Sequence, residues 1–329
     1  MAYGALPLHH LHGLAALAGA TALVTGGAGF IGSCLCELLR LAGWSVHSVS
    51  RRPARDTPAH RHWPVDLCDA AATRELINLI RPDYVFHLAG HVWATADLAH
   101  VLPTFHSNLH STVNLLHSLV GTGCRRLIAT GSQIEPDTRS GETVANAPYD
   151  AAKWASSDYI RMFHARYQLP AAIARVFMVY GPQQDPAKLI PYVIGCLSRG
   201  EVPKLTSGKR FGDWIYVDDV AAGLARLALA PDAAGRTVDL GSGTLISTMD
   251  LVEAVCAIME SPIRPAFGAM PDRPPEPTRV ARIAETRRIL GWAPEVTLTD
   301  GLSRTIDWFR RQAEAPLAET GAATQLVLP

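Results

Sequence analysis

The sequence predicts an α/β protein built on a doubly wound parallel sheet, with a smaller lobe in its C-terminal part. Short apolar runs rich in β-branched residues alternate with segments of helical spacing as far as Tyr180. A glycine-rich segment, Thr25–Gly32, separates the first apolar run from the first helical segment. Strands that alternate with helices are typical of βαβ units, in which the strands run parallel and helices cover both faces of the sheet.

The expected elements follow one another in regular order. The strands are short apolar runs bounded by turn residues, and they cover Ala22–Thr25, Ser45–Ser50, Tyr84–Leu88, Arg126–Ala129 and Ala171–Val179. A further extended stretch ends at Asp66 and Leu67. The helices have apolar residues three and four apart, and they cover Ile31–Leu41, Thr73–Ile80, Thr104–Leu119 and Tyr149–Tyr167. Each expected helix connects two strands that can lie in one parallel sheet.

The texture of the chain changes after Tyr180, where prolines become frequent and the elements become shorter. We therefore expect a main sheet domain over residues 20–180. A smaller lobe is expected over residues 181–312, with segments that return to the main sheet. Residues 1–19 are interpreted as an N-terminal extension. Residues 313–329, rich in Ala, Glu and Thr, are interpreted as a flexible tail.

The composition indicates a globular protein and argues against several classes of partner. Hydrophobic residues make up 48% of the 329 residues and charged residues 18%, which suffices for a sizeable core. The 30 Lys and Arg balance the 30 Asp and Glu, so the net charge predicts neither nucleic acid nor an anionic membrane as partner. No apolar run approaches the length of about 18 residues that spans a bilayer. The 6 cysteines lack a Cys-x-x-Cys spacing, so we expect reduced thiols, no metal site and a cytoplasmic location.

The glycine-rich segment has the G-x-x-G-x-x-G spacing and lies between an expected strand and an expected helix. Glycines at such a turn let backbone amides approach a pyrophosphate, and the N-terminus of the helix adds its partial positive charge. This position predicts a Rossmann-type, dinucleotide-binding domain over residues 20–180. The expected phosphate-binding residues are Gly26, Gly29, Phe30, Ile31 and Gly32.

The end of the second expected strand indicates which dinucleotide is bound. An acidic residue there hydrogen-bonds the ribose 2′-hydroxyl of NAD, whereas this chain has Ser50 followed by Arg51 and Arg52. Guanidinium groups suit a 2′-phosphate. We therefore expect NADP as the cofactor, with NAD as the alternative. Asp66 and Leu67 are expected to lie near the adenine.

Tyr149 and Lys153 form a candidate catalytic pair, because residues four apart share one face of a helix. An ammonium group close to a phenol favours the phenolate, so that the tyrosine can exchange a proton near neutral pH. Ser132, which follows the expected strand Arg126–Ala129, supplies a hydroxyl for a substrate oxygen. Together with the glycine-rich segment, these residues predict a proton-exchanging site beside a bound dinucleotide.

With these motifs identified, the sequence resembles the extended short-chain dehydrogenases, the group of nucleotide-sugar epimerases, dehydratases and reductases. The resemblance covers about residues 20–312 and rests on landmarks in a constant order. They are TGGAGFIG at 25–32, DL at 66–67, HLAG at 87–90, SNLHSTVNLL around Asn108, GS at 131–132, YDAAK at 149–153, RVFMVYGP at 175–182, DWIYVDDVA at 213–221 and LGWAP at 290–294.

The resemblance implies roles for the residues at matching positions. Tyr149 would be the acid/base, Lys153 would also bind the nicotinamide ribose, and Ser132 would orient the substrate oxygen. Asn108 would lie in the helix beneath the active site. The residues implied to line the cofactor are Leu88, Ala89, Gly90 and Val176.

Some positions depart from the family's pattern, and these bear on the substrate. Met178 stands where many relatives have Asn, and Gly212-Asp213 stands where many have Arg-Asp. In those relatives the Asn and the Arg often contact the nucleotide diphosphate. The segment Gly131–Glu135 lacks the Thr-Asp-Glu of sugar 4,6-dehydratases and is closer to the Gly-Ser-x-x-Glu of some keto-sugar reductases. The expected substrate-binding residues are His91, Gln133, Met178, Lys188, Arg210 and Arg273.

Three functions remain open at this point. A keto-sugar reductase is favoured, because Arg51 and Arg52 suit an exchangeable NADPH that reduces a ketone on a nucleotide-activated sugar. An NAD-dependent nucleotide-sugar epimerase needs the same residues and is the alternative. A non-catalytic dinucleotide-sensing module is disfavoured, because such modules usually lose the tyrosine or the lysine. The resemblance also implies a homodimer, paired through helices such as Tyr149–Tyr167.

Overall fold

The computed structural model describes residues 13–51, 60–93, 95–137, 141, 144–272 and 278–314. Within these residues, seven parallel strands form the main sheet, in the order β3-β2-β1-β4-β5-β6-β9. They are β1 (Thr21–Thr25), β2 (Ser45–Ser50), β3 (His60–Pro64), β4 (Tyr84–His87), β5 (Arg126–Ser132), β6 (Ala171–Val176) and β9 (Thr237–Leu240). The order reverses between β1 and β4, where doubly wound sheets bind ligands at the carboxyl ends of their strands. The predicted fold class is confirmed.

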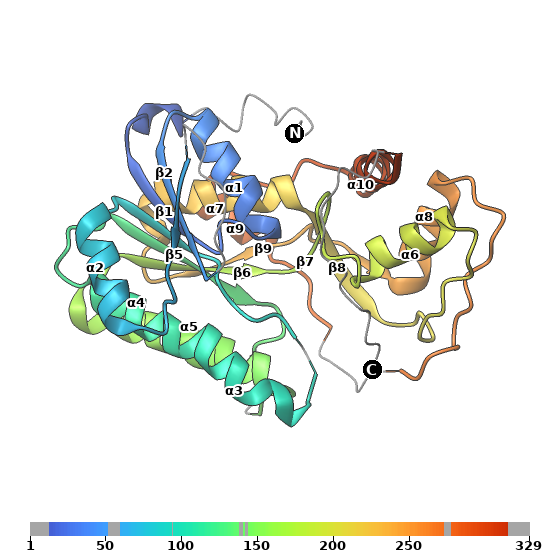
Figure 1. Cartoon of the computed structure of the whole chain (residues 1–329), viewed down its shortest axis with the longest axis horizontal. Coiled ribbons are helices and arrows are strands. Elements are labelled where there is room, and N and C mark those ends of the chain that lie inside the picture. Colours follow the sequence, from blue (N-terminus) through green and yellow to red (C-terminus); the bar gives the residue numbers. More distant parts are fainter. Residues whose placement is uncertain are drawn as a thin grey trace.

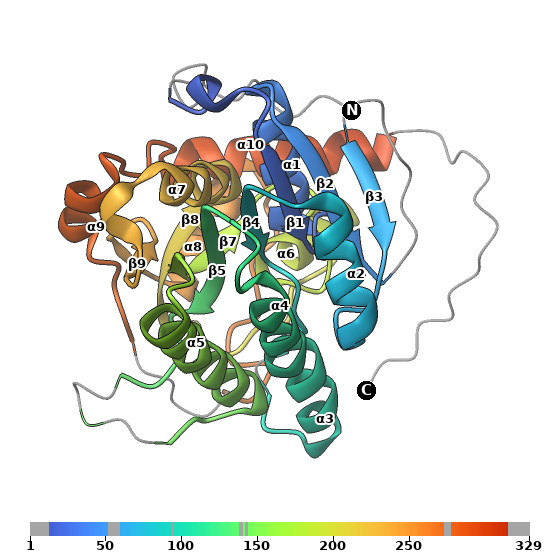
Figure 2. The same ribbon diagram turned by 90° about the vertical axis from the view of Figure 1, so that its left-hand side faces the viewer.

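Helices cover both faces of the main sheet, as Figure 2 shows. The α-helices around it are α1 (Phe30–Leu41), α2 (Ala70–Ile80), α3 (Val101–Thr104), α4 (Ser111–Leu119), α5 (Pro148–Tyr167), α7 (Val217–Leu229) and α9 (Ile283–Leu290). Short 3-10 helices are η2 (Ala15–Leu17), η3 (Leu98–His100) and η6 (Pro231–Ala233). Helices α1 and α7 pack together on one face, while α2, α4 and α5 cover the other. In the described part of the chain, no helix is long and apolar enough to cross a membrane.

Local sequence explains where two of these helices begin. The Asp69 side chain caps α2 by accepting the amides of Ala71 and Ala72. Helix α5 begins with Pro148, whose fixed φ suits the first helical position and whose missing N–H needs no partner there. Pro148 thereby sets the start of α5 one residue before Tyr149.

The segment expected as one helix over Thr104–Leu119 is interrupted. Helices α3 and α4 are joined by the π-helical segment η4 (Phe105–His110). A π-helical turn inserts an extra residue and frees a backbone carbonyl from its usual partner four residues on. Asn108 lies in this turn, and its carbonyl accepts the hydroxyl of Ser156 at 2.9 Å. The interruption therefore ties η4 to α5.

The run expected as one strand, Ala171–Val179, is divided between two sheets. The main-sheet strand β6 ends at Val176, and the amide of the buried Phe177 donates to the carbonyl of Leu240 at 3.0 Å. The chain then enters β7 (Met178–Tyr180) of a second sheet, which among the described residues also contains β8 (Phe211–Tyr216) and β10 (Leu245–Ser247). Both halves of the run are apolar, so its pattern could not reveal this division.

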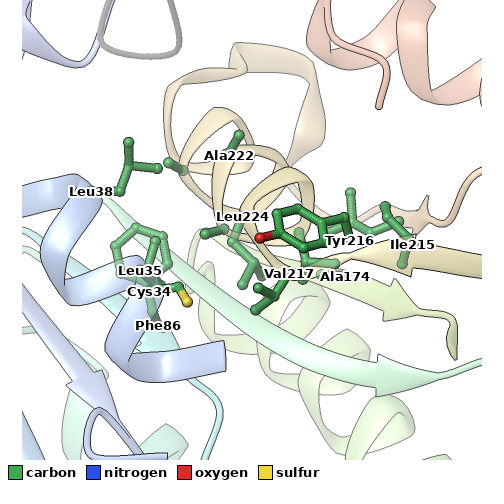
Figure 3. Close-up of a cluster of buried hydrophobic side chains, with 14 of the residues drawn as sticks. Cys34, Leu35, Leu38, Phe86, Ala174, Ile215, Tyr216, Val217, Ala222 and Leu224 are labelled. Carbon is green, nitrogen blue, oxygen red and sulfur yellow. The ribbon is translucent and has the colours of Figure 1, made fainter. Parts of the chain in front are cut away.

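The second sheet belongs to a smaller lobe, on the right in Figure 1. Its helices are α6 (Leu189–Ser198), α8 (Thr248–Ile258) and α10 (Leu298–Glu314), which pack against one another. The chain returns to the main sheet through α7 and the edge strand β9. Figure 3 shows Leu35 of α1, Leu224 of α7 and Ile215 of β8 in one buried cluster. The two lobes therefore share a hydrophobic core.

Candidate active site

The glycine loop between β1 and α1 is built for close backbone approach. Gly26 has φ +68°, and a Cβ there would lie 3.0 Å from the amide nitrogen of Ala89. A Cβ on Gly32 would collide with the carbonyl oxygen of Gly26. Helix α1 begins at Phe30 after Gly29, which provides no side-chain cap. The first amides of the helix thus keep their capacity to bind an anion, which fits the pyrophosphate of a dinucleotide.

A hydrogen-bonded chain holds the end of β4 against this loop. Thr25 Oγ1 accepts the amides of Leu88 at 3.1 Å and Ala89 at 3.0 Å. It also forms a 2.8 Å hydrogen bond with Nδ1 of His87, whose Nε2 lies 2.9 Å from Thr112 Oγ1. Because Thr25 Oγ1 already accepts two amides, its hydroxyl hydrogen is directed to His87. Burial, with a contribution from the Lys153 charge, lowers the pKa of His87 to about 3, so this histidine is neutral.

Asn108 anchors the backbone that follows β4. Its Nδ2 donates to the carbonyl of His91 at 3.1 Å, and its Oδ1 accepts the amide of His91 at 2.6 Å. A Cβ on Gly90 would lie 2.9 Å from the same Oδ1. Asn108 therefore sets the position of Gly90 and His91 at the end of β4. Both bonds go to the backbone of His91, so Asn108 acts on this segment whatever side chain stands at position 91.

Ser132, Tyr149 and Lys153 lie together, as the sequence predicts. Strand β5 extends to Ser132, three residues beyond the expected end, so this serine is held by the sheet. Lys153 Nζ donates to the carbonyl of Thr130 at 2.8 Å and lies 3.3 Å from its Oγ1. Burial lowers the pKa of Lys153 to about 8, while the carboxylate of Glu135 opposes the shift. The lysine therefore stays largely charged at neutral pH.

Burial raises the pKa of Tyr149 above its usual value, and a hydrogen bond with the Ser132 side chain opposes this rise. The tyrosine sits one helical turn before Lys153 on α5, and both side chains are buried. A buried phenol beside a serine hydroxyl and a lysine can donate a proton to, or accept one from, an oxygen placed between them.

The carboxylate of Glu135 holds Ser132 and Ser157 in place, a contact that the residue pattern did not predict. Its Oε1 accepts the amide of Ser132 at 2.6 Å, and its Oε2 accepts the hydroxyl of Ser157 at 2.8 Å. Burial raises the pKa of Glu135 even though these hydrogen bonds lower it. The Gly-Ser-x-x-Glu spacing was the available signal, because a carboxylate three residues after Ser132 can reach back to its amide.

The loop after β5 is also pinned from the C-terminal part of the chain. Arg279 Nη1 donates to the carbonyl of Gln133 at 2.7 Å and to the carbonyl of Glu135. The Gln133 amide donates to the carbonyl of Val176 at 3.2 Å. Gln133 and Val176, predicted for substrate and cofactor respectively, thus lie side by side at the ends of β5 and β6.

The residues predicted for the adenosine end gather at the ends of β2 and β3. Asp66 Oδ1 accepts the amide of Cys68 at 3.0 Å, and the buried Leu67 accepts Nδ2 of Asn114 through its carbonyl at 2.9 Å. Arg51 is exposed at the end of β2. Burial lowers the pKa of His91, and the charges of His100 and Arg51 lower it further. The guanidinium of Arg51 is therefore close enough to act electrostatically on His91, which follows β4. Arg52 lies outside the described residues.

The predicted substrate residues come from both lobes. His91 Nε2 lies 3.2 Å from Nδ1 of His100, and the ring of Trp93 stacks on His100 at 5.2 Å. Lys188, which precedes α6 in the smaller lobe, places its Nζ 6.0 Å from the Trp93 ring centroid. His91 and Lys188 are thereby brought to one region from distant parts of the sequence.

Met178 and Arg210 lie in the second sheet region, and Arg273 lies outside the described residues. Met178 begins β7 and faces Gly212, where a Cβ would lie 3.5 Å from its Cγ. Arg210 is exposed just before β8, and its carbonyl accepts the amide of Thr248 at 2.8 Å. Neither residue makes a described contact with Tyr149 or Ser132.

Comparison with known proteins places this arrangement among sugar-nucleotide enzymes. The model of the NAD dependent epimerase/dehydratase family matches residues 22–241. The chain is 28% identical to the dTDP-glucose 4,6-dehydratase of Neisseria gonorrhoeae, over 87% of the chain and 94% of the relative. It is 28% identical to the UDP-glucose 4-epimerase of Mycolicibacterium smegmatis, over 89% of the chain and 99% of the relative.

Solved structures of similar proteins match this chain over most of its length. The epimerase Mth375 of Methanothermobacter thermautotrophicus matches with a TM-score of 0.84 and 26% identity, over 94% of this chain and 97% of that one. The Bordetella bronchiseptica enzyme WbmF, in complex with NADH, matches with a TM-score of 0.78 and 27% identity, over 91% of this chain and 94% of that one. The similarity therefore includes both lobes.

Proposed function

Because the chain belongs to the NAD dependent epimerase/dehydratase family, we propose that it is an NAD-dependent nucleotide-sugar epimerase. The chain is an enzyme of this family, and its relatives include a UDP-glucose 4-epimerase and a solved epimerase structure. These relatives support the epimerase more than the keto-sugar reductase that the sequence analysis favoured. The family also includes dehydratases, so the site must distinguish between the two reactions.

The observation that carries the proposal is the state of Glu135. A 4,6-dehydratase eliminates water and needs a second acid/base pair beside the tyrosine. In the segment Gly131–Glu135 the carboxyl available is that of Glu135, and both of its oxygens accept hydrogen bonds from Ser132 and Ser157. An epimerase needs a single proton-transferring group at the reacting oxygen, and Tyr149 with Ser132 supplies it.

In the proposed mechanism, Tyr149 accepts the hydroxyl proton of the sugar and later returns it to the same oxygen. Ser132 donates a hydrogen bond to that oxygen and keeps it beside the phenol. The hydrogen bond with Ser132 opposes the rise in the pKa of Tyr149 caused by burial. Lys153, one helical turn away on α5, adds a positive charge that favours a phenolate. A bound NAD would supply the hydride acceptor for the sugar carbon and the hydride donor for its return to the opposite face.

The residues proposed to hold NAD are those of the glycine loop, Leu88 to Gly90, Asp66 and Lys153. The first amides of α1, which Gly29 leaves without a side-chain cap, are proposed to bind the pyrophosphate. The structure of WbmF contains NADH, which supports NAD over the NADP expected from Arg51. The keto-sugar reductase remains a second candidate, because the exposed Arg51 can contact a 2′-phosphate.

A nucleotide sugar is the proposed substrate, held between the end of β4 and the smaller lobe by residues such as His91 and Lys188. The solved UDP-glucose 4-epimerase of Thermotoga maritima contains UDP-glucose. The acid/base pair lies at the end of the main sheet, while Met178 lies in the second sheet and Arg210 precedes its strand β8. A nucleotide sugar suits this arrangement, with its sugar beside the acid/base pair and its nucleotide towards the smaller lobe.

The proposed enzyme is also a homodimer. Leu98 is 85% exposed, Leu102 65% and Phe105 45%, in the consecutive segments η3, α3 and η4. These segments contact α5, on which Tyr159 is 41% and Met162 37% exposed. Several exposed apolar side chains on elements that pack together are typical of a protein interface. A second copy presenting the same helices would cover both parts, and sedimentation velocity of the purified protein tests this.

The experiment that tests the function begins with the protein as isolated. Denaturation followed by mass spectrometry should release NAD, and UDP-sugars should reach an epimer equilibrium without added cofactor. Tyr149→Phe should retain the dinucleotide and lower the turnover rate by about 10²–10⁴-fold, the usual contribution of a general acid/base. A keto-sugar consumed at the expense of added NADPH, with no epimer formed, would establish the reductase instead. Wild-type turnover by Tyr149→Phe would contradict both.

A further inference from the structure

A pocket of about 430 Å³ lies beside the main sheet, between α5, β6, β9 and α9. Figure 2 shows the edge strand β9 with α9 and α5 on either side of it. Of the described residues that line this pocket, none was predicted to bind cofactor or substrate. Its volume falls within the range of about 300–1,000 Å³ that is typical of small-molecule sites. Ser132, Tyr149 and Lys153 are not among its lining residues.

The pocket is lined by arginines from four elements or their ends. Among the described residues these are Arg161 of α5, Arg175 of β6, Arg236 before β9 and Arg282 before α9. The sequence separates them by up to 121 residues, so the fold alone brings them together. Guanidinium groups grouped around a cavity favour an anionic ligand, because each presents a planar fork to carboxylate or phosphate oxygens.

The ion pairs given for the described residues engage two of these arginines, Arg175 and Arg282, while the carboxylates of Glu135 and Asp137 also line the pocket. Arg175 and Arg282 share the buried Asp239, at 3.2 Å and 3.3 Å, and Arg282 also reaches Glu285 at 3.0 Å. Within the described structure, Arg161 contacts only the hydroxyl of Thr237, at 3.4 Å, and Arg236 forms no ion pair. A ligand with several acceptor oxygens would pair with both.

Arg175 presents a guanidinium of fixed orientation to this pocket. Its Nη1 donates to Oδ1 of the buried Asp239 at 3.2 Å, and its side chain is 16% exposed. The fork of Arg175 is therefore held in place before any ligand binds.

Trp154 and the carboxylates of the wall narrow the class of ligand. Trp154 of α5 is half-buried and lines the pocket, where an aromatic ring can pack on the apolar face of a sugar. Glu285 also lines it and can accept hydroxyl hydrogens, as carboxylates accept hydrogen bonds from donors. We propose that this pocket is a second binding site, which takes a sugar phosphate with the phosphate on the arginines.

Glu135 connects this pocket to the candidate active site. It lines the pocket, and its Oε1 accepts the amide of Ser132 at 2.6 Å. A phosphate bound beside Arg175 would act on the same carboxylate from the other side. Occupation of the pocket therefore changes the electrostatic surroundings of Ser132 and Tyr149 without contact to the substrate.

Isothermal titration of the holoenzyme with glucose 1-phosphate tests the site. The wild type should bind it, and the double variant Arg161→Ala/Arg236→Ala should bind it at least about 10-fold more weakly, as expected for lost charge-assisted hydrogen bonds. Arg166→Ala is the matched control, because Arg166 is an exposed arginine of α5 that does not line the pocket. Urea unfolding and retained dinucleotide show that each variant is folded.

Three further measurements separate the outcomes. Saturating UDP-glucose should leave the binding of glucose 1-phosphate unchanged, and complete competition would mean that it binds at the substrate site. Trp154→Phe should weaken the binding of glucose 1-phosphate and leave the binding of inorganic phosphate unchanged. Equal affinity of the wild type for the two ligands would overturn the assignment to sugar phosphates. An equal loss in Arg166→Ala, or no binding by the wild type, would overturn the site itself. All these readouts are independent of epimerase activity.

Discussion

Glu135→Ala and Glu135→Gln separate the hydrogen bonds of this carboxylate from its charge. In the wild type, Oε1 accepts the amide of Ser132 at 2.6 Å and Oε2 accepts the hydroxyl of Ser157 at 2.8 Å. Alanine removes both acceptors and leaves the buried amide of Ser132 unpaired. Glutamine keeps an oxygen for Ser132, and its new amide can donate to Ser157, whose hydroxyl is able to reverse.

The expected magnitudes differ for the two variants. An unpaired buried amide costs about 1–3 kcal/mol, and the lost side chain leaves a cavity, so alanine should lower the unfolding free energy by about 2–4 kcal/mol. Glutamine should stay within about 1 kcal/mol of the wild type, the net worth of one ordinary hydrogen bond. Alanine should also lower kcat by about 10-fold or more, since small displacements of a catalytic group are costly. Glutamine should keep most of the rate.

The pH dependence of the difference between wild type and Glu135→Gln has a definite sign. Burial raises the pKa of Glu135 in the folded protein above its unfolded value. The folded state therefore holds this proton more tightly, and that stabilisation is lost as pH rises through the folded pKa. At about pH 4, where the unfolded carboxyl begins to ionise, wild type and glutamine should have similar unfolding free energies. Glutamine should become relatively more stable towards neutral pH.

Urea unfolding across this pH range, with initial rates at neutral pH, measures these quantities. The glutamine variant is the matched control for volume and shape, and alanine is the test of the hydrogen bonds. Equal destabilisation by the two substitutions would show that the carboxylate does not act through the amide of Ser132. A difference between glutamine and wild type that is independent of pH would show that the pKa of Glu135 is not raised by folding.

Three more changes test other parts of the site. Lys153→Met should lower kcat by about 10²-fold or more. The wild-type rate should decline above about pH 8, where Lys153 loses its proton, and an unchanged rate at high pH would contradict a catalytic role of its charge. Gly32→Ala should reduce the dinucleotide retained on purification, because its Cβ would meet the carbonyl of Gly26, whereas Gly195→Ala, facing the flexible Arg199 side chain, should retain it. Arg51→Ala should weaken the binding of NADPH more than that of NADH in fluorescence titrations. Equal losses of affinity for the two dinucleotides would contradict a contact between Arg51 and the 2′-phosphate.

Relations within one element were predictable from the sequence. The spacing of Tyr149 and Lys153 on a helix, and the glycines before α1, depend on local geometry that the residue pattern reports directly. The end of β5 was placed too early, because Gly131 and Ser132 do not look like strand residues. Pairing with Arg175 and Val176 of β6 extends the strand to Ser132. The neighbouring strand, and not local preference, decided that boundary.

Relations between elements were not predictable in the same way. The chain from Thr25 through His87 and Thr112 joins residues up to 87 apart, and each of these residue types is common at a strand end or on a helix. The division of the run Ala171–Val179 depends on Phe177 donating to Leu240 of β9, which is far along the chain. Such contacts have no signature in a single sequence, because many other partners are chemically equivalent.

The sequence by itself determined the α/β fold class, the glycine loop before α1 and the placement of Tyr149 and Lys153 on one helix, since hydrophobic periodicity and short spacings encode them. The tertiary structure alone decided that Glu135 holds Ser132 and that Asp239 lies between Arg175 and Arg282. The physical reason is the range of the interactions. Local geometry acts over a few residues, whereas a buried carboxylate takes whichever donors the packing of distant strands and helices brings within about 3 Å of it.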